Sequence, residues 1–323
     1  VLHRTYTYLL QGSRRQLVRH QFSSRLQEDQ PNSGIYIHPK RTNLHSCPST
    51  MWIWLLLGIF IPAVIGISIL LPHYTSNRVR YYACFVCYAI NTSFICYILM
   101  PLFLLRPKSL ANLKILSKYG QHVSEVIGIT WMVRNKRILE KQNVAMILSN
   151  HQSSLDILGT MHLVAMDETG LVEVIAKKEL FRTPLGHALW MCGSTFIDRS
   201  NPESSMAALR MSSKTLRRRK AKLWVYPEGT RNEAWGTMLP FKKGAFICAI
   251  EAQVPIIPVV FSPYYYINKS NKNFDKGTSI LSVLEEVPTE GLQMKDVNDL
   301  TKRVYDLMLA EFEKLKEEVE REL

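Results

Sequence analysis

Apolar residues gather first in two long runs of this chain and later in short, regularly spaced ones. Residues 52–72 form a run without a single charge, and residues 81–105 form a second, slightly more polar run. Each run reaches the ~20 residues that a helix needs to cross the hydrocarbon core of a bilayer. Because only residues 73–80 connect them, the pattern predicts a two-helix hydrophobic membrane hairpin.

Lysines and arginines favour the outer flanks of this hairpin over its connection, which holds only Arg78 and Arg80. The outer basic residues are Lys40, Arg41, Arg106, Lys108, Lys114 and Lys118. The positive-inside rule then places both flanks in the cytosol. Shallow insertion of one run into the membrane is the alternative, because the polar residues 91–93 interrupt the second run.

From residue 108 onward, short apolar runs alternate with amphipathic stretches. The predicted strands are residues 144–148, 172–176, 195–197, 222–226 and 256–261. The predicted helices are residues 154–165, 184–191, 202–219 and 243–251, followed by a long amphipathic helix over residues 297–323. This alternation predicts an α/β domain with a mainly parallel central sheet and flanking helices.

The pattern divides the chain into three parts. Residues 1–50 show no sustained periodicity, and we expect a disordered or non-native N-terminal extension, because Met51 stands immediately before the first apolar run. The Ser/Arg-rich, acid-poor start of this extension also resembles a transit peptide, which is the weaker interpretation. Residues 51–107 are the predicted membrane hairpin, and residues 108–323 are the predicted α/β domain with its C-terminal amphipathic helix.

The 323 residues carry a formal net charge of +13. This balance favours a phosphate-bearing partner, such as nucleic acid, an anionic membrane face or a phosphorylated small molecule. The two apolar runs, and the lack of interleaved aromatic and basic residues, argue against nucleic acid. The run Arg217–Lys220 with Lys222 suits CoA phosphates or anionic headgroups, but such a run is more commonly a solvated helix face. Cys84 and Cys87 have a C-x2-C spacing, but no second Cys/His pair completes a zinc set, so we interpret them as small apolar residues.

The first candidate for chemistry is the pair His151 and Asp156, five residues apart. On one helix this spacing separates two side chains by about 140°, and on one strand they face opposite sides. The two can therefore meet only across a turn, between a strand ending at Leu148 and a helix that Ser153 begins as a capping box. A neutral imidazole can take a proton from an alcohol while a carboxylate fixes its tautomer. The alternative is that Asp156 only caps the helix.

The second candidate is the segment Tyr226–Asn232, which follows a predicted strand. Its Gly229 permits a tight turn. Arg231 then projects from the carboxyl end of the strand, where open α/β sheets bind ligands, and its planar fork suits phosphate oxygens. Glu228 or Thr230 can hold the loop or contact a hydroxyl. The alternative is a plain turn with a solvated arginine.

Four ordered blocks of this chain resemble the signature of the glycerolipid acyltransferase family. They are Asn150-His151 with Asp156, Gly193–Arg199, Tyr226–Arg231 and Val254–Val259, and the segment Ala176–Leu180 resembles the lysine block of the family. The resemblance covers roughly residues 51–323 and is strongest to the 1-acyl-sn-glycerol-3-phosphate acyltransferases, also called lysophosphatidic acid acyltransferases. Tyr226 stands where the family often has Phe.

The resemblance implies a role for each matching residue. His151 would be the general base toward the sn-2 hydroxyl, and Asp156 would orient and polarise it. The acceptor's phosphate and glycerol would be bound by Arg231 with Glu228, Gly229 and Thr230, and further anion contacts would come from Arg199 and Lys178. The block Val254–Val259 would shape the acyl pocket or form a buried core strand.

The implied function is that of a membrane-bound, acyl-CoA-dependent 1-acylglycerol-3-phosphate O-acyltransferase of phospholipid biosynthesis. Its partners would be acyl-CoA as co-substrate, lysophosphatidic acid and membrane lipids, with no cofactor, metal or nucleic acid. The family also implies the endoplasmic reticulum membrane, with the catalytic domain facing the cytosol. The alternatives are another lysophospholipid or glycerol 3-phosphate as acceptor, or a catalytically silent membrane scaffold, against which intact His151, Asp156 and Arg231 argue.

Overall fold

The computed structural model describes residues 66, 70, 77–141, 144–167, 171–232 and 234–321. The extension over residues 1–50 and nearly all of the first predicted membrane segment, residues 52–72, lie outside these ranges. What is observed is therefore the second apolar run and the α/β domain.

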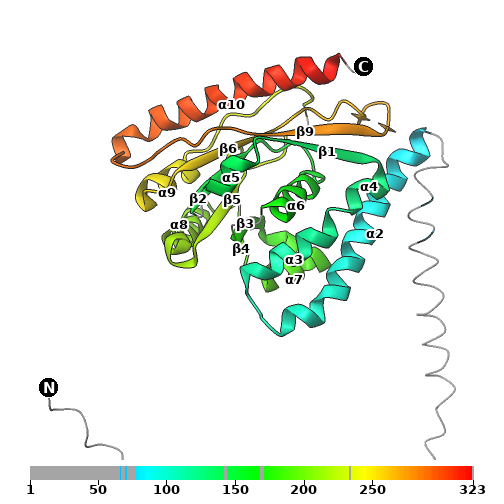
Figure 1. Cartoon of the computed structure of the whole chain (residues 1–323), viewed down its shortest axis with the longest axis horizontal. Helices are drawn as coiled ribbons and strands as arrows, with labels where there is room; N and C mark the ends of the chain where they lie inside the picture. Colours follow the sequence, from blue (N-terminus) through cyan, green and yellow to red (C-terminus); the bar gives the residue numbers. More distant parts are fainter. Residues whose placement is uncertain are drawn as a thin grey trace, which may run out of the picture. The chain divides into compact units, whose positions relative to one another are not determined.

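A seven-stranded sheet in the order β1-β9-β6-β2-β5-β3-β4 forms the centre of the domain (Figure 1). Its strands are β1 (Ile129–Arg134), β2 (Ala145–Ser149), β3 (Leu171–Lys177), β4 (Thr195–Ile197), β5 (Ala221–Val225), β6 (Ile256–Phe261) and β9 (Gly277–Val283). All neighbours are parallel except β6 and β9. The strands β2, β5 and β6 are buried at every position, as a parallel sheet covered on both faces requires. The predicted mainly parallel α/β class is confirmed.

Helices cover both faces of this sheet, over two separate hydrophobic clusters (Figure 1). One cluster contains residues of α3 (Leu110–Gly120), α4 (Val123–Ile127), α5 (Arg137–Lys141), α6 (Asp156–Met166) and α7 (Pro184–Met191). The other contains residues of α8 (Pro202–Arg219), α9 (Gly244–Ala252) and α10 (Val297–Glu320). The remaining elements are the short pair β7 (Ile267–Asn268) and β8 (Asn273–Phe274) and the 3-10 turns η1 (Lys178–Arg182) and η2 (Met294–Asp296).

The second apolar run forms α2 (Asn77–Leu104), which begins four residues before the predicted start. Among the described residues, α2 is the one helix long and apolar enough to cross a membrane. It packs along α7 and also against α3, α4 and β8, and Arg80 Nε donates to the carbonyl of Phe274 at 2.6 Å. Its exposed large apolar residues are Val79, Tyr82, Val86, Tyr97, Ile98, Leu102 and Leu104. Helix α2 thus has one protein-facing side and one exposed apolar side.

Candidate active site

The carboxyl ends of β2 and β5 lie side by side and bring the two candidate segments together. The register pairs Leu148 with Val225, so His151 and Glu228, each three residues further on, come opposite each other. The chain leaves β2 towards α6 on one face of the sheet and leaves β5 towards α9 on the other face. A switch point of this kind is where open α/β sheets bind ligands.

His151 and Asp156 contact each other across the turn between β2 and α6. His151 Nδ1 lies 2.7 Å from Asp156 Oδ2, with 13% of the His151 side chain exposed and Asp156 fully buried. The predicted meeting across a turn is therefore observed. The predicted helix start at Ser153 is wrong, because α6 begins at Asp156 itself, whose carboxylate turns back onto the preceding loop.

Four donors surround the Asp156 carboxylate. The backbone N–H groups of Gln152 and Ser153 donate to Oδ2 at 2.7 and 3.0 Å, and the Tyr264 hydroxyl donates to Oδ1 at 2.7 Å. His151 Nδ1 is the fourth partner. Because the carboxylate oxygens serve as acceptors throughout, Nδ1 carries the imidazole proton, and Nε2 is left as the basic nitrogen. Sequence reasoning missed Tyr264, although its place just beyond the carboxyl end of β6 is a usable signal.

Neighbouring strands fix the loop that carries His151. The buried Asn150 donates through Nδ2 to the carbonyl of Phe261 at 3.0 Å and accepts from the Phe261 N–H at 2.8 Å, which ties the loop to β6. The Tyr226 ring stacks on the imidazole with the ring centres 4.1 Å apart and 22° between the planes. The Tyr226 hydroxyl lies 2.8 Å from Thr160 Oγ1 on α6. The imidazole is thus held on its face as well as at Nδ1.

Glu228 contacts backbone N–H groups on both of its carboxylate oxygens. Its Oε1 accepts from the His151 N–H at 2.7 Å, and its Oε2 accepts from the Leu239 N–H at 3.1 Å. The residue is 3% exposed. Burial raises the pKa of its carboxyl to about 7, although the two backbone hydrogen bonds act in the opposite direction. Glu228 was predicted either to hold the loop or to contact a substrate hydroxyl. In the structure, both of its carboxylate oxygens hold the loop.

Two arginines bring positive charge to this end of the sheet. Burial, and after it the charge of Arg231, lowers the pKa of Arg199. Arg199 Nε is buried and has no hydrogen-bond partner among the described residues. Arg231 is exposed, and within the described ranges no acidic side chain pairs with it. A buried guanidinium nitrogen without an acceptor is unfavourable, so the pair is suited to receive an anion.

The other predicted contacts lie around the same loop or outside it. Gly229 has a φ of 72°, and a Cβ there would come 2.9 Å from Lys242 Nζ, so the loop needs glycine at this point. Thr230 is exposed next to Arg231. Lys178 is 70% exposed at its side chain, and its Nζ lies 3.7 Å from Asp198 Oδ2. Sequence reasoning missed the cation of Lys242, which lies beside the loop.

The basic run at the end of α8 does not form one solvated face. Arg217 Nη2 donates to the carbonyl of Gln253 at 2.6 Å. Arg219 Nη1 lies 2.5 Å from Glu173 Oε2, and Lys222 is wholly buried in an ion pair with Asp167. The expectation of a solvated face is therefore wrong for Lys222, because β5 is covered on both faces of the sheet.

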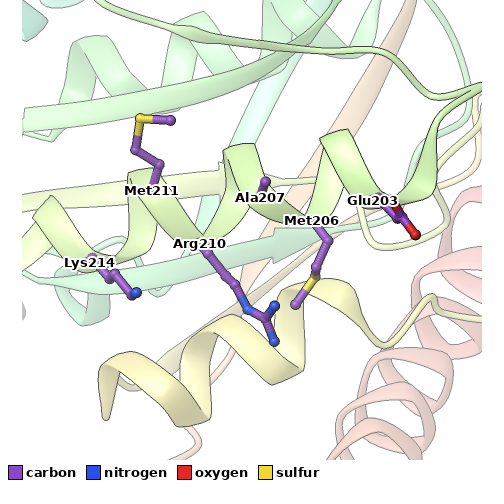
Figure 2. A pocket seen from close by; sticks show the side chains of 6 residues that line it. All are labelled: Glu203, Met206, Ala207, Arg210, Met211 and Lys214. Atoms are coloured by element: carbon purple, nitrogen blue, oxygen red, sulfur yellow. The ribbon is translucent and has the colours of Figure 1, made fainter.

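A cavity of about 550 Å³ lies along α8 (Figure 2). It is lined by Glu203, Met206, Ala207, Arg210, Met211 and Lys214. The guanidinium of Arg210 is already paired with Glu251 at 2.8 Å. None of the candidate site residues lines this cavity, so it is separate from the His151 site.

The chain is similar to known acyltransferases. A family model described as Acyltransferase matches residues 131–262, which contain every candidate site residue. The 1-acyl-sn-glycerol-3-phosphate acyltransferase alpha of Bos taurus is 38% identical over 224 residues, which cover 69% of this chain and 76% of that protein. The human alpha protein is also 38% identical, over 69% of this chain and 77% of its own. The human beta protein is 35% identical, over 64% of this chain and 73% of its own.

The fold is also found among solved structures. The chain matches the 1-acyl-sn-glycerophosphate (LPA) acyltransferase PlsC from Thermotoga maritima with a TM-score of 0.51 and 20% sequence identity. The match covers 82% of this chain and 94% of that chain. At this identity the similarity supports the α/β fold with its mostly parallel sheet.

Proposed function

This chain belongs to the glycerolipid acyltransferase family, and we propose that it transfers a fatty acyl group from acyl-CoA to the sn-2 hydroxyl of lysophosphatidic acid. The products are phosphatidic acid and free CoA. The observation that carries the proposal is the 2.7 Å contact between His151 Nδ1 and Asp156 Oδ2 at the carboxyl end of β2. The names of relatives at 35–38% identity support the acceptor.

In the proposed reaction, His151 Nε2 accepts the proton of the sn-2 hydroxyl as its oxygen attacks the thioester carbonyl carbon. The new C–O bond gives a tetrahedral intermediate, whose collapse breaks the C–S bond. The imidazolium then returns its proton to the leaving CoA sulfur. Asp156, held by its other donors, stabilises the imidazolium without taking its proton. The acyl group passes directly between substrates, so neither a covalent acyl-enzyme nor a metal takes part.

The acceptor's phosphate is proposed to bind between Arg199 and Arg231. Donors for phosphate oxygens come from the Nε of Arg199, which has no partner in the described part of the chain, and from the exposed fork of Arg231. Gly229 and Thr230 would lie along the glycerol, and Lys178 would contribute a more distant positive charge. Glu228 would act by positioning the His151 loop, since both of its oxygens are occupied by backbone N–H groups.

The exposed apolar side of α2 is proposed to face a membrane. Helix α2 reaches this site, because the Tyr88 hydroxyl donates to the carbonyl of Ser154 at 3.2 Å. A lipid acceptor and an acyl chain would then approach the imidazole from the bilayer surface. The proposed location is the endoplasmic reticulum membrane, with the catalytic domain in the cytosol.

The first test is acyl transfer from oleoyl-CoA in membranes that carry this chain, against a panel of acceptors. We expect lysophosphatidic acid to be strongly preferred over other lysophospholipids and glycerol 3-phosphate. His151→Ala should remove turnover while expression and membrane association persist. His122→Ala, which changes an exposed histidine on another segment, is the matched control and should keep full activity.

Retained turnover in the His151→Ala protein would refute the mechanism. A preference for a different acceptor would keep the mechanism and replace the proposed substrate. No transfer to any acceptor by well-folded protein would favour the membrane scaffold instead.

A further inference from the structure

A second cavity, of about 270 Å³, lies between the segment that follows α2 and the end of α7. It is lined by Lys108, Trp190, Gly193, Ser194 and Arg219. Ser194 stands at the amino end of β4, whereas Arg199 follows its carboxyl end. The strand between them, at ~3.3 Å per residue, separates the two ends by about 10 Å. The cavity is therefore separate from the His151 site.

Both charged groups that line this cavity are cations. Lys108 Nζ lies 5.0 Å from the centre of the Trp190 ring, and in the described part of the chain no acidic side chain pairs with it. Arg219 Nη1 is held by Glu173, which is 1% exposed. Nη2 of the same guanidinium lies 3.3 Å from the position of a Cβ on Gly193. Glu173 thus fixes the guanidinium and leaves its second nitrogen at the cavity wall.

Ser194 also lines this cavity, and its side-chain hydroxyl has no partner among the described residues. The residue is 8% exposed, and its buried Oγ makes no hydrogen bond within the described residues. Gly193 has a φ of 77°, and a Cβ there would come 2.7 Å from the carbonyl oxygen of Lys108. The glycine therefore allows the backbone of Lys108 to pack directly against the residue that precedes Ser194. A buried hydroxyl left unpaired is unfavourable, and an acceptor in the cavity would relieve this.

We propose that this cavity is a second anion site, which binds a phosphate group through Lys108, Arg219 and Ser194. An ammonium, a guanidinium and a hydroxyl can all donate to phosphate oxygens, and none of the described residues that line the cavity carries a carboxylate. The cavity of Figure 2 offers a contrast, because Glu203 lines it and Arg210 is already paired.

The phosphate has two possible sources, a membrane lipid or the solution. Leu104 and Leu105, which precede Lys108, are 61% and 77% exposed and continue the exposed apolar side of α2. A lipid surface on that side would bring phosphate headgroups to the level of Lys108. A soluble phosphate would reach the same donors through the open side of the cavity.

The experiment measures the acetylation rate of individual lysines by mass spectrometry in the full chain. Lys108 is followed with inorganic phosphate in detergent, and in vesicles of phosphatidylcholine with or without phosphatidic acid. The exposed Lys118 on α3 is the internal control. At ten times the Kd, bound phosphate should slow acetylation of Lys108 by about tenfold and leave Lys118 unchanged. In the Ser194→Ala protein, about ten times more phosphate should be needed for the same protection of Lys108.

Protection by inorganic phosphate alone would support the site with a soluble ligand. Protection that also needs phosphatidic acid in the vesicles, beyond that given by phosphatidylcholine, would support the site with a lipid ligand. Equal acetylation of Lys108 under all conditions would overturn the proposal. Protection that survives Ser194→Ala unchanged would also overturn it, since the buried hydroxyl is central to the site. Neither residue touches the His151 machinery, so failure here leaves the proposed acyl transfer standing.

Discussion

The carboxylate of Glu228 is bonded to the backbone of His151, at 2.7 Å between Oε1 and the peptide nitrogen, and not to its imidazole. A second bond runs between the same two loops, from the Asn232 N–H to the His151 carbonyl at 2.7 Å. The loop that follows β5 therefore sets the height of the proposed base above the sheet. In the proposed reaction, Glu228 would therefore act by positioning His151.

Glu228→Gln should lower kcat by about tenfold or more while leaving KM for the acceptor nearly unchanged. The oxygen of an amide can accept from only one of the two backbone N–H groups, so the His151 loop becomes less firmly held. Small displacements of a reacting group lower the rate of the chemical step. Steady-state kinetics with varied acceptor measure this split. Glu313→Gln is the matched control, because Glu313 lies on α10 and is 51% exposed at its side chain. An increase confined to KM would mean that Glu228 contacts the acceptor.

The raised pKa of Glu228 should make its contribution to stability depend on pH. Its carboxyl titrates at about 7 when folded and near 4.5 when unfolded. Between these values the folded chain holds a proton that the unfolded chain has lost, so the free energy of unfolding falls as pH rises. Urea unfolding measures this effect. From pH 5 to pH 8, the free energy of unfolding of the wild type should fall by about 1–3 kcal/mol relative to that of Glu228→Gln. A constant difference between the two proteins would contradict the raised pKa.

Asp156→Asn should reduce turnover by about a thousandfold or more, because an amide no longer fixes the Nδ1 proton or stabilises the imidazolium. It should also destabilise the fold by about 2 kcal/mol, since its NH₂ group faces buried donors. Tyr264→Phe removes only one of the four donors and should cost about 1 kcal/mol with a much smaller loss of turnover. Single-turnover kinetics and urea unfolding separate the two effects. Similar turnover in the two variants would refute the orienting role of Asp156.

Arg199→Met should change stability and acceptor affinity in opposite directions. Among the described residues the buried Nε of Arg199 lacks a partner, so replacing the side chain with an apolar one should raise the free energy of unfolding by about 1 kcal/mol. Loss of the charge should raise KM for the acceptor by about tenfold or more. Exposed Arg218 provides the control variant Arg218→Met, for which neither quantity should move. If Arg199→Met lowered the free energy of unfolding and left KM for the acceptor unchanged, Arg199 would have a structural role and would not bind the acceptor.

Elements with local signals could be predicted from the sequence. The observed bounds of α7 and α8 coincide with the predicted ones, and each helix has a proline in its first turn after a side chain that caps it, Thr183 and Asn201. Strands β4 and β6 also have the predicted bounds. Such signals lie within a few residues of the element, so no tertiary information is needed.

Strands β1 and β9 and helices α3 to α5 were not predicted. In strand β9, Ser279 and Ser282 are buried. Because both are polar, a search for apolar runs does not recognise this segment as a core strand. In the fold, Ser279 Oγ lies 2.6 Å from the Tyr266 hydroxyl, and Ser282 donates to Glu311 of α10 at 2.6 Å. A polar residue is buried cheaply only when a partner comes from elsewhere in the chain. That partner is invisible to a local pattern.

Local sequence patterns predicted that His151 and Asp156 could meet only across a turn, and that Arg231 follows the carboxyl end of a strand. Both follow from helix and strand geometry over a few residues. The fold placed His151 and Glu228 opposite each other, through the register of two strands that are far apart in sequence. It also decided that Tyr264 bonds Asp156. Such contacts depend on which distant segments pack together, and the local hydrophobic periodicity of the sequence carries no information about that.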